Sequence, residues 1–157
     1  MDLGLKNKVA LVQGASTGLG YAAALELARE GCRLAICSRT KVNIQKAAAQ
    51  ISKITGATVQ GFVCDLADAD SRQQMLKEIN SNWGAIDILV ANNGGPPPGH
   101  FRSLDEGHWS KALQNNLISM KDSAQEVLGD MQAKGWGRIV FITSVSVKQP
   151  LESLILS

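Results

Sequence analysis

The chain has 157 residues, of which 45% are hydrophobic and 19% are charged, and its formal net charge is +2. These values are ordinary for one globular domain, and they give no reason to expect a nucleic-acid partner or a membrane partner. The three cysteines, Cys32, Cys37 and Cys64, contain no Cys-x-x-Cys spacing. We therefore expect free, buried thiols in a cytoplasmic protein, and no metal site.

Short apolar runs typical of strands alternate with longer runs at helical spacing. We expect strands at residues 8–14, 33–38, 58–65, 86–95 and 137–144. We expect helices at residues 19–31, 41–56, 69–84 and 105–135, the last being one long helix or two. Asp70 or Ser71 is the expected cap of the third helix. This alternation predicts an α/β fold with a doubly wound parallel sheet of the Rossmann type and right-handed crossovers.

The least ordinary residue clusters all follow expected strands. They are 14–20 (GASTGLG), 38–40 (SRT), 64–68 (CDLAD), 92–95 (NNGG) and 143–146 (TSVS). Ligands of open parallel sheets bind beyond the carboxyl ends of the strands. The clusters therefore predict one ligand site along that edge of the sheet.

The first cluster lies between the first expected strand and the first expected helix. Its glycines let the main chain turn tightly and approach a ligand closely, and the helix N-terminus offers free N–H groups with a partial positive charge. An ordinary tight turn would also use glycine. We favour a pyrophosphate site, because the turn follows the first strand of a βαβ unit. Its expected residues are Gly14, Ser16, Thr17, Gly18, Leu19 and Gly20.

The GxxxGxG spacing and four further motifs together resemble the short-chain dehydrogenase/reductase family. The further motifs are CDLAD, NNGG, WSKALQNNL (109–117) and GRIVFITS (137–144). The resemblance covers residues 8–144 and implies an oxidoreductase that binds a nicotinamide dinucleotide. It also implies a small-molecule carbonyl or alcohol substrate and a homodimer or homotetramer. The NNGGPPPG loop resembles a subgroup described as 3-oxoacyl-carrier-protein-reductase-like, so a 3-oxoacyl thioester is one expected substrate.

On the cofactor side, the resemblance implies that Asp65 hydrogen-bonds the adenine, with Leu66 beside the ring. It also assigns Asn92 and Gly94 to the cofactor site. Gln13 occupies the position where the family has a threonine that braces the turn after the fourth strand.

The end of the second strand indicates which cofactor is bound. Sites specific for NAD(H) carry an acidic residue there, which holds the ribose 2′-hydroxyl, and this chain has none. Ser38 and Arg39 lie where a 2′-phosphate would be, and Ser16 and Lys41 could add to its binding. A solvated arginine is the alternative. We expect NADP(H) rather than NAD(H).

On the catalytic side, the resemblance assigns the carbonyl-orienting serine to Ser144. Asn116 would hold a helix bend and a proton-relay water, with Asn115 as the alternative register. The family's catalytic tyrosine lies roughly a dozen residues after the serine, in a Tyr-xxx-Lys helix turn. The only tyrosine of this chain is Tyr21, which we expect to pack the first helix onto the sheet, and counting from Ser144 reaches Ser157.

We therefore expect residues 1–157 to be a dinucleotide-binding domain from the N-terminal part of a longer protein, with the C-terminal part of the sheet missing from this chain. Two functions remain open. One is an NADP(H)-dependent carbonyl reductase or alcohol dehydrogenase, and the other is a catalytically impaired dinucleotide-binding protein. A regulatory Rossmann module is a third, weaker alternative.

Overall fold

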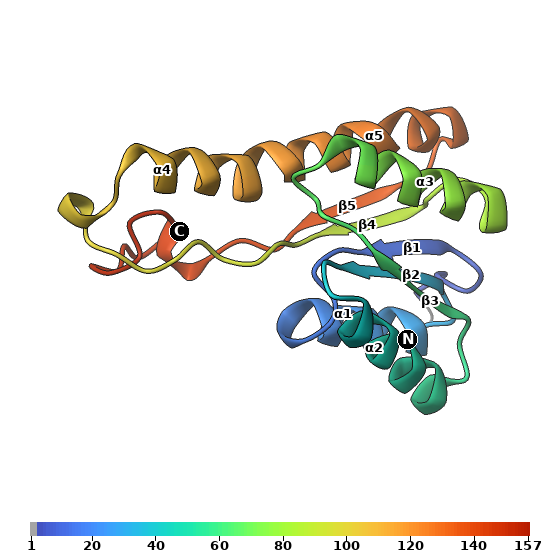
Figure 1. The fold of residues 1–157 in the computed structure, drawn as a ribbon. Helices are drawn as coiled ribbons and strands as arrows, with labels where there is room; N and C mark the ends of the chain where they lie inside the picture. Colours follow the sequence, from blue (N-terminus) through green and yellow to red (C-terminus); the bar gives the residue numbers. More distant parts are fainter. Residues whose placement is uncertain (1–2) are drawn as a thin grey trace.

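The computed structural model describes residues 3–157, which form one parallel sheet between two layers of helices (Figure 1). All neighbouring strands are parallel, in the order β3-β2-β1-β4-β5. The strands are β1 (Val9–Val12), β2 (Arg33–Ser38), β3 (Val59–Val63), β4 (Ile88–Ala91) and β5 (Arg138–Phe141). The helices are α1 (Gly18–Arg29), α2 (Lys41–Thr55), α3 (Ala69–Trp83), α4 (Glu106–Leu113) and α5 (Ser119–Lys134). The expected α/β fold with a parallel sheet is confirmed.

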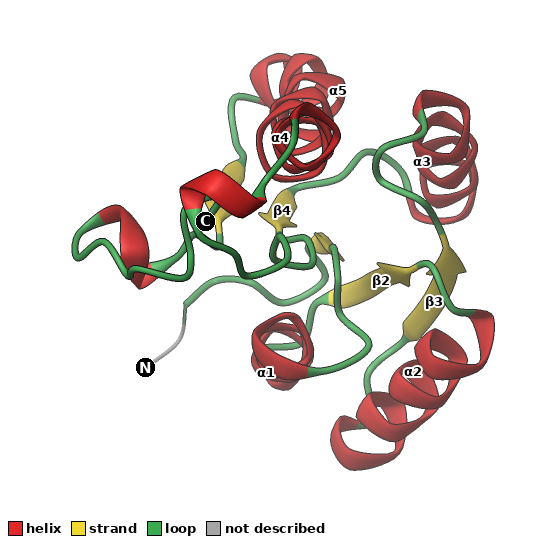
Figure 2. Cartoon of the chain, turned by 60° about the vertical axis from the view of Figure 1, so that its left-hand side comes forward, coloured by secondary structure: helices red, strands yellow, loops and turns green. Residues whose placement is uncertain are grey.

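Helices α1 and α2 cover one face of the sheet, and α3 and α5 cover the other (Figure 2). Successive side chains of a strand point to opposite faces, so Ala10 and Val12 of β1 pack toward α1 and α2. Val9 and Leu11 pack toward α3 and α5. All four side chains are buried, as a central parallel strand requires.

The order of the strands reverses between β1 and β4. From β1 the chain proceeds to β2 and β3 on one side, and then returns to place β4 on the other side of β1. A reversal of this kind opens a crevice beyond the carboxyl ends of the two central strands. The glycine turn 14–20 and the segment 92–95 both begin at this crevice.

The helix expected at 105–135 is one long rod with a wider turn inside it. Residues Gln114–Ile118 form a π-helical turn between α4 and α5, and the residues at both junctions keep helical dihedral angles. Such turns interrupt the regular hydrogen-bond ladder and occur often at functional sites. Asn115 and Asn116 both lie in this turn. No helix within residues 3–157 is both long enough and apolar enough to cross a membrane.

The expected cap of α3 is wrong. Asp68 caps this helix, because its side chain accepts a hydrogen bond from the Asp70 N–H at 3.2 Å. The helix begins at Ala69, two residues earlier than a cap at Asp70 would allow. Ser71 lies inside the first turn, where its hydroxyl oxygen accepts from the Asp65 N–H at 3.1 Å.

Candidate dinucleotide site

The turn between β1 and α1 has no room for side chains at two of its glycines. Gly14 has φ of +58°, and a Cβ there would lie 2.8 Å from Asn92 Nδ2. A Cβ on Gly20 would lie 2.5 Å from the carbonyl oxygen of Gly14. Gly18 also has a positive φ, +62°, but a Cβ there would enter open space. The glycines therefore let the main chain fold back on itself and leave the outer side of the turn open.

Hydrogen bonds tie this turn to both neighbouring strands. The Asn92 side chain donates from Nδ2 to the carbonyl oxygens of Gln13 and Gly14, at 3.3 and 3.2 Å. The Ala15 N–H donates to the carbonyl of Cys37 in β2 at 3.1 Å. The glycine turn is thereby held in one position, which would reduce the entropy lost on binding a ligand.

Gln13 does not supply the bracing contact to the strand-four turn with its side chain. Its side chain is 1% exposed and points to α5, where Nε2 donates to Ser123 Oγ at 2.9 Å. Oε1 of Gln13 is buried and has no partner within residues 3–157. Asn92 therefore braces the turn here.

The start of α1 leaves its first N–H groups free of side-chain partners. Thr17 is the N-cap residue and forms no side-chain capping bond within the described residues. Thr17, Gly18 and Leu19 are exposed, and Ser16 is half-buried. The first N–H groups of a helix lack intrahelical acceptors and lie at the positive end of its dipole. This arrangement fits a phosphate group.

Next to the turn, Cys37 of β2 and Cys64, which directly follows β3, form a pair of thiols in contact. Cys37 and Cys64 are both free and buried, as predicted, and so is Cys32. Hydrogen bonding to Cys64, together with burial, raises the pKa of Cys37 well above its ordinary value. Cys37 therefore stays a neutral thiol and acts as a small packing residue under the crevice.

Arg39 is exposed at the end of β2 and borders a cavity of about 670 Å³. Residues of the 93–97 segment and Lys111 of α4 line the same cavity. The carboxylate in this lining belongs to Asp105, which caps α4 by accepting from the His108 N–H at 2.9 Å. That hydrogen bond and the contact with the His108 ring lower the pKa of Asp105, so it is ionised at neutral pH. Arg39 and Lys111 then give this part of the crevice two cations.

Asp65 and Leu66, in the loop after β3, are the two residues expected to contact adenine, and only Asp65 has an exposed side chain. The Asp65 side chain is exposed, and Oδ1 accepts from the Ala67 N–H at 3.0 Å. The side chain of Leu66 is only 6% exposed and packs into the core beside Met75. A contact of Leu66 with an adenine ring would therefore have to come from its main chain.

The π-turn separates the roles of the two adjacent asparagines. The carbonyl oxygen of Asn115 accepts from Asn93 Nδ2 at 2.8 Å and from the hydroxyl of Ser119. Asn116 Nδ2 is buried and has no hydrogen-bond partner within residues 3–157. Asn116 also lines three cavities, whereas Asn115 lines one of them. Asn116 is therefore the residue whose side chain can donate to a bound water or ligand.

A second cavity, of about 640 Å³, brings the expected catalytic residues together. Its lining includes Leu19 of the glycine turn, Asn116, Ser144 and Ser157. The remaining lining residues are uncharged as well, and most are apolar. This cavity differs from the first one, whose lining includes the charged side chains of Arg39, Asp105 and Lys111.

Ser144 is paired with a neighbour that the motif did not indicate. The Ser146 N–H donates to Ser144 Oγ at 3.1 Å, and the two hydroxyl oxygens are 2.6 Å apart. Ser146 is buried, and the short helical turn Val145–Val147 holds it there. A hydroxyl has one donor and two acceptor sites. When Ser146 also donates its hydroxyl proton to Ser144, the Ser144 O–H is left to donate into the cavity.

The loop 96–104 is attached to the last segment of the chain. The Gly99 N–H donates to the carbonyl of Ser153 at 2.7 Å, and Gly99 forms a parallel bridge with Leu154. Phe101 packs edge-on against Trp109 of α4, with ring centroids 6.2 Å apart.

Tyr21 packs against the apolar cluster under α1, as predicted.

Sequence reasoning missed Arg72, Asn93, Ser123 and Ser146. Arg72 is buried on the same helical face as Met75 and Ile79, and Ser123 on the same face as Met120 and Val127. A polar residue at an apolar position of a helix was the available signal, since such a residue needs a buried partner. Asn93 and Ser146 lie within the clusters 92–95 and 143–146 that predicted a ligand site, but no local signal gave either residue a role of its own.

Residues 8–156 match the family model described as short chain dehydrogenase. The chain belongs to the short-chain dehydrogenase family. Dehydrogenase/reductase SDR family member 4 of Oryctolagus cuniculus is 32% identical over 151 residues, covering 96% of this chain and 58% of that protein. Nodulation protein G of Azospirillum brasilense is 34% identical over 144 residues, covering 90% of this chain and 58% of that protein.

Solved structures of the family have the same fold. L-sorbose reductase of Gluconobacter frateurii, complexed with NADPH and L-sorbose, superposes with a TM-score of 0.94 at 26% identity, covering 99% of this chain and 59% of that one. Actinorhodin polyketide ketoreductase with NADPH gives 0.90 at 29% identity, covering 96% and 58%. NAD⁺-bound xylitol dehydrogenase, at 24% identity and 0.90, has the same fold over 97% of this chain and 58% of that one. The chain thus spans just under three fifths of these relatives' length.

Proposed function

We propose that this short-chain dehydrogenase chain binds NADP(H) and takes part in hydride transfer between the nicotinamide and a ketone or secondary alcohol. The observation that carries the proposal is the glycine turn, where Gly14 and Gly20 pack against main chain and Asn92 while the first N–H groups of α1 stay open. Such a cradle suits a pyrophosphate. It lies at the same sheet edge as the cavity lined by Ser144 and Asn116.

The preference for NADP(H) is supported by charge. Arg39 and Lys111 border the cavity beside the end of β2, and Asp105 there is already paired with His108. A guanidinium binds a phosphate through paired, charge-assisted hydrogen bonds. L-sorbose reductase and the polyketide ketoreductase were both solved with NADPH, which also favours this cofactor for the chain.

Bound nicotinamide would supply or accept the hydride, and the chain's own side chains would orient the carbonyl. Ser144 and Asn116 each offer a donor to an oxygen in the second cavity. Donors aimed at a developing negative charge are among the largest contributions to catalysis. The uncharged, largely apolar lining favours a neutral carbonyl group on an apolar chain, such as a 3-oxoacyl thioester.

A dinucleotide-binding protein with impaired catalysis is the second candidate. Tyr21, the only tyrosine of residues 1–157, packs against the core under α1, and counting from Ser144 to the expected tyrosine position reaches Ser157, which lines the second cavity. A serine hydroxyl is a much weaker acid than tyrosine, whose pKa is about 10. Proton transfer through Ser157 alone would therefore be slow.

We also propose that the chain forms a homo-oligomer through α4 and α5. Leu113, Leu117 and Leu128 are exposed along this rod. Apolar side chains exposed along one long helix favour burial against a second copy. Sedimentation velocity on the protein, and on a variant with Leu117→Glu, tests this expectation.

Calorimetric titration with NADPH and NADH tests cofactor binding. We expect NADPH to bind more tightly, and Arg39→Ala to weaken NADPH about tenfold while changing NADH by less than about twofold. Arg29→Ala, at the far end of α1, is the matched control and should change neither affinity. Equal losses for both cofactors in Arg39→Ala would remove the 2′-phosphate role from this residue.

Nicotinamide absorbance tests catalysis. The protein is mixed with NADPH and a panel of ketones and 3-oxoacyl thioesters, and Ser144→Ala is compared with Thr143→Ala, which lines the same cavity. The reductase predicts turnover that Ser144→Ala abolishes and Thr143→Ala preserves. Tight NADPH binding without turnover of any substrate would favour the second candidate, and absence of binding would end both.

A further inference from the structure

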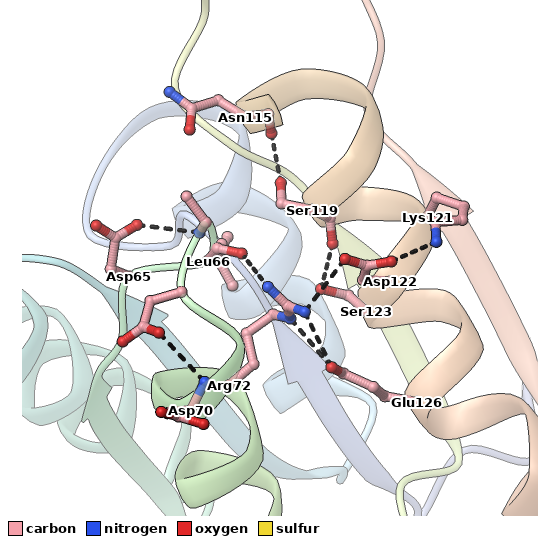
Figure 3. A network of polar contacts seen from close by, with 12 residues as sticks. Asp65, Leu66, Asp70, Arg72, Asn115, Ser119, Lys121, Asp122, Ser123 and Glu126 are labelled. Carbon is pink, nitrogen blue, oxygen red and sulfur yellow. Dashed lines mark hydrogen bonds and ion pairs between the residues drawn. The ribbon is translucent and has the colours of Figure 1, made fainter. Parts of the chain in front are cut away.

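A buried arginine joins the loop after β3 to the long helix α5 (Figure 3). Arg72 is 3% exposed, although it lies in the first turn of α3. Its Nη1 donates to the carbonyl oxygen of Leu66 at 2.7 Å. Its Nη2 donates to Asp122 at 3.3 Å, and its Nε donates to both carboxylate oxygens of Glu126 at 3.2 and 3.3 Å.

The geometry of these contacts requires an arginine. A buried cation needs opposite charges and hydrogen bonds around it, and the rigid fork of the guanidinium reaches three acceptor groups at once, one carbonyl and two carboxylates. A lysine has one compact ammonium group and cannot span the loop carbonyl and two carboxylates. A hydrogen bond from Lys121 lowers the pKa of Asp122 below its ordinary value, which keeps this acceptor ionised.

The contacts of Arg72 determine where the loop after β3 lies. Leu66 follows Asp65 directly, and the carbonyl of Leu66 is the atom that Arg72 holds. The Asp65 N–H is held in turn by the hydroxyl of Ser71, the residue before Arg72. Two consecutive residues of α3 therefore hold the main chain on both sides of the Asp65 carboxylate, which points outward (Figure 3).

The same turn of α5 also positions the phosphate turn. Ser123 lies next to Asp122, and it accepts the hydrogen bond from Gln13 at the start of the glycine turn. Asp122, Ser123 and Glu126 thus hold two segments that are far apart in the sequence. The distance between the loop after β3 and the glycine turn is set through one rigid helix.

We propose that Arg72 is a positioning residue for adenine recognition: by fixing the Leu66 carbonyl to α5, it holds the Asp65 carboxylate where it accepts a hydrogen bond from the 6-amino group of adenine. This inference rests on the proposed binding of NADP(H). A role in stability alone, joining α3 to α5, is the competing explanation. The two differ in whether Arg72 affects the recognition of one chemical group on the cofactor.

A cofactor analogue separates the two explanations. In nicotinamide hypoxanthine dinucleotide phosphate an oxygen replaces the 6-amino group, so the hydrogen bond to Asp65 is lost. Dissociation constants for NADPH and for the reduced analogue are measured on the full chain, on Arg72→Lys and on Arg72→Met. We expect the wild type to prefer NADPH about tenfold, and both variants to bring the ratio close to one.

A purely structural arginine would weaken both ligands equally and leave the ratio unchanged, which would overturn the inference. Arg29→Met removes an exposed, ion-paired arginine on α1 and should keep the wild-type ratio. Glu126→Gln is the second variant, in case the Arg72 variants do not fold. It leaves the Leu66 contact in place and should lower the ratio by a smaller factor, about threefold.

The outcomes also distinguish this inference from the proposed function. If the wild type binds neither ligand, the NADP(H) proposal itself fails. If the wild type binds both ligands equally well, the NADP(H) proposal stands but Asp65 does not recognise the amino group, and the inference is wrong. If the ratio of the two dissociation constants is unchanged in both Glu126→Gln and Arg72→Lys, the inference is also wrong while the NADP(H) proposal stands.

Discussion

Val12 of β1 and Val140 of β5 lie on the two sides of Val90, in the same row of the sheet. Val12 is 0% exposed, whereas Val140 is 51% exposed. Both strands are short and largely apolar, so their own residues do not account for the difference. β1 lies between two strands and under helices, while β5 is paired on one side only.

This contrast extends to the two regions of the site. The glycine turn follows the buried strand β1 and is tied to β2 and to Asn92. Ser144 follows the exposed strand β5, and its neighbours Val145 and Val147 are exposed as well. The glycine turn is therefore held rigidly within this chain, and the region around Ser144 depends on fewer contacts.

The largest effect should come from filling the glycine turn. In Gly20→Ala the new methyl group would lie 2.5 Å from the Gly14 carbonyl oxygen, so the main chain has to move. We expect NADPH affinity to fall roughly 100-fold, measured by calorimetry. Gly129→Ala in α5 is the control, since its methyl group meets nothing within 4 Å. It should raise the free energy of unfolding by about 0.5–1 kcal/mol. Wild-type affinity in Gly20→Ala would contradict the rigid turn.

The two valines provide the direct test of the comparison. Val12→Thr buries a hydroxyl group in an apolar cluster and should lower the free energy of unfolding by about 1–3 kcal/mol. Val140→Thr changes a half-exposed side chain and should alter it by less than about 0.5 kcal/mol. Urea denaturation of the 157-residue chain measures both. An equal loss in the two variants would mean that another surface covers β5 in solution.

Asp87 connects β1 to α5 at the edge of the sheet opposite the candidate site. Its contribution to the free energy of unfolding should depend on pH. Its carboxylate accepts from the Val9 N–H at 2.9 Å and from Lys134 Nζ at 2.8 Å. Burial alone would raise the pKa of Asp87, but these hydrogen bonds lower it below its ordinary value. At neutral pH we expect Asp87→Asn to lower the free energy of unfolding by about 1–2 kcal/mol.

The sign of the pH dependence follows from the lowered pKa. The stabilisation is fully present above the pKa of the unfolded chain, about 3.9, and disappears as the pH falls through the lower value of the folded chain. The difference between wild type and Asp87→Asn should therefore shrink below about pH 4. Urea denaturation from pH 7 to pH 3 measures it, with Asp130→Asn on the exposed side of α5 as control. If the difference in unfolding free energy between wild type and Asp87→Asn were the same at all pH values, a charge effect would be ruled out.

The smallest effect on stability should come from a surface ion pair on α1, the helix that follows the glycine turn. Glu26 and Arg29 form an exposed ion pair on α1. We expect Glu26→Gln to change the free energy of unfolding by about 0.2–0.5 kcal/mol, and by less in 1 M salt. A loss comparable with that of Val12→Thr would show that surface charge, and not burial, stabilises this region.

The elements near the glycine turn were predictable because their signals are local. Strand, turn and helix follow one another within residues 8–31, and the glycine spacing that marks the turn lies within that segment, although Gly14 and Gly20 also pack against Asn92. The network around Arg72 was not predictable. Arg72 reaches partners 50 and 54 residues away, and Gln13 reaches one 110 residues away. No local pattern reports such a pairing, and the capping of α3 by Asp68 was missed because three acidic or hydroxyl residues compete at its start.

The amino-acid order alone determined the alternation of strands and helices, the glycine turn and the membership in a dehydrogenase family, since these depend on hydrophobic period and on residues close in the chain. Only the tertiary structure decided that Asn116 faces the cavities, that Leu66 points into the core and that Arg72 holds the loop beside Asp65. The reason is that burial and hydrogen-bond partners are set by which distant segments the sheet brings together.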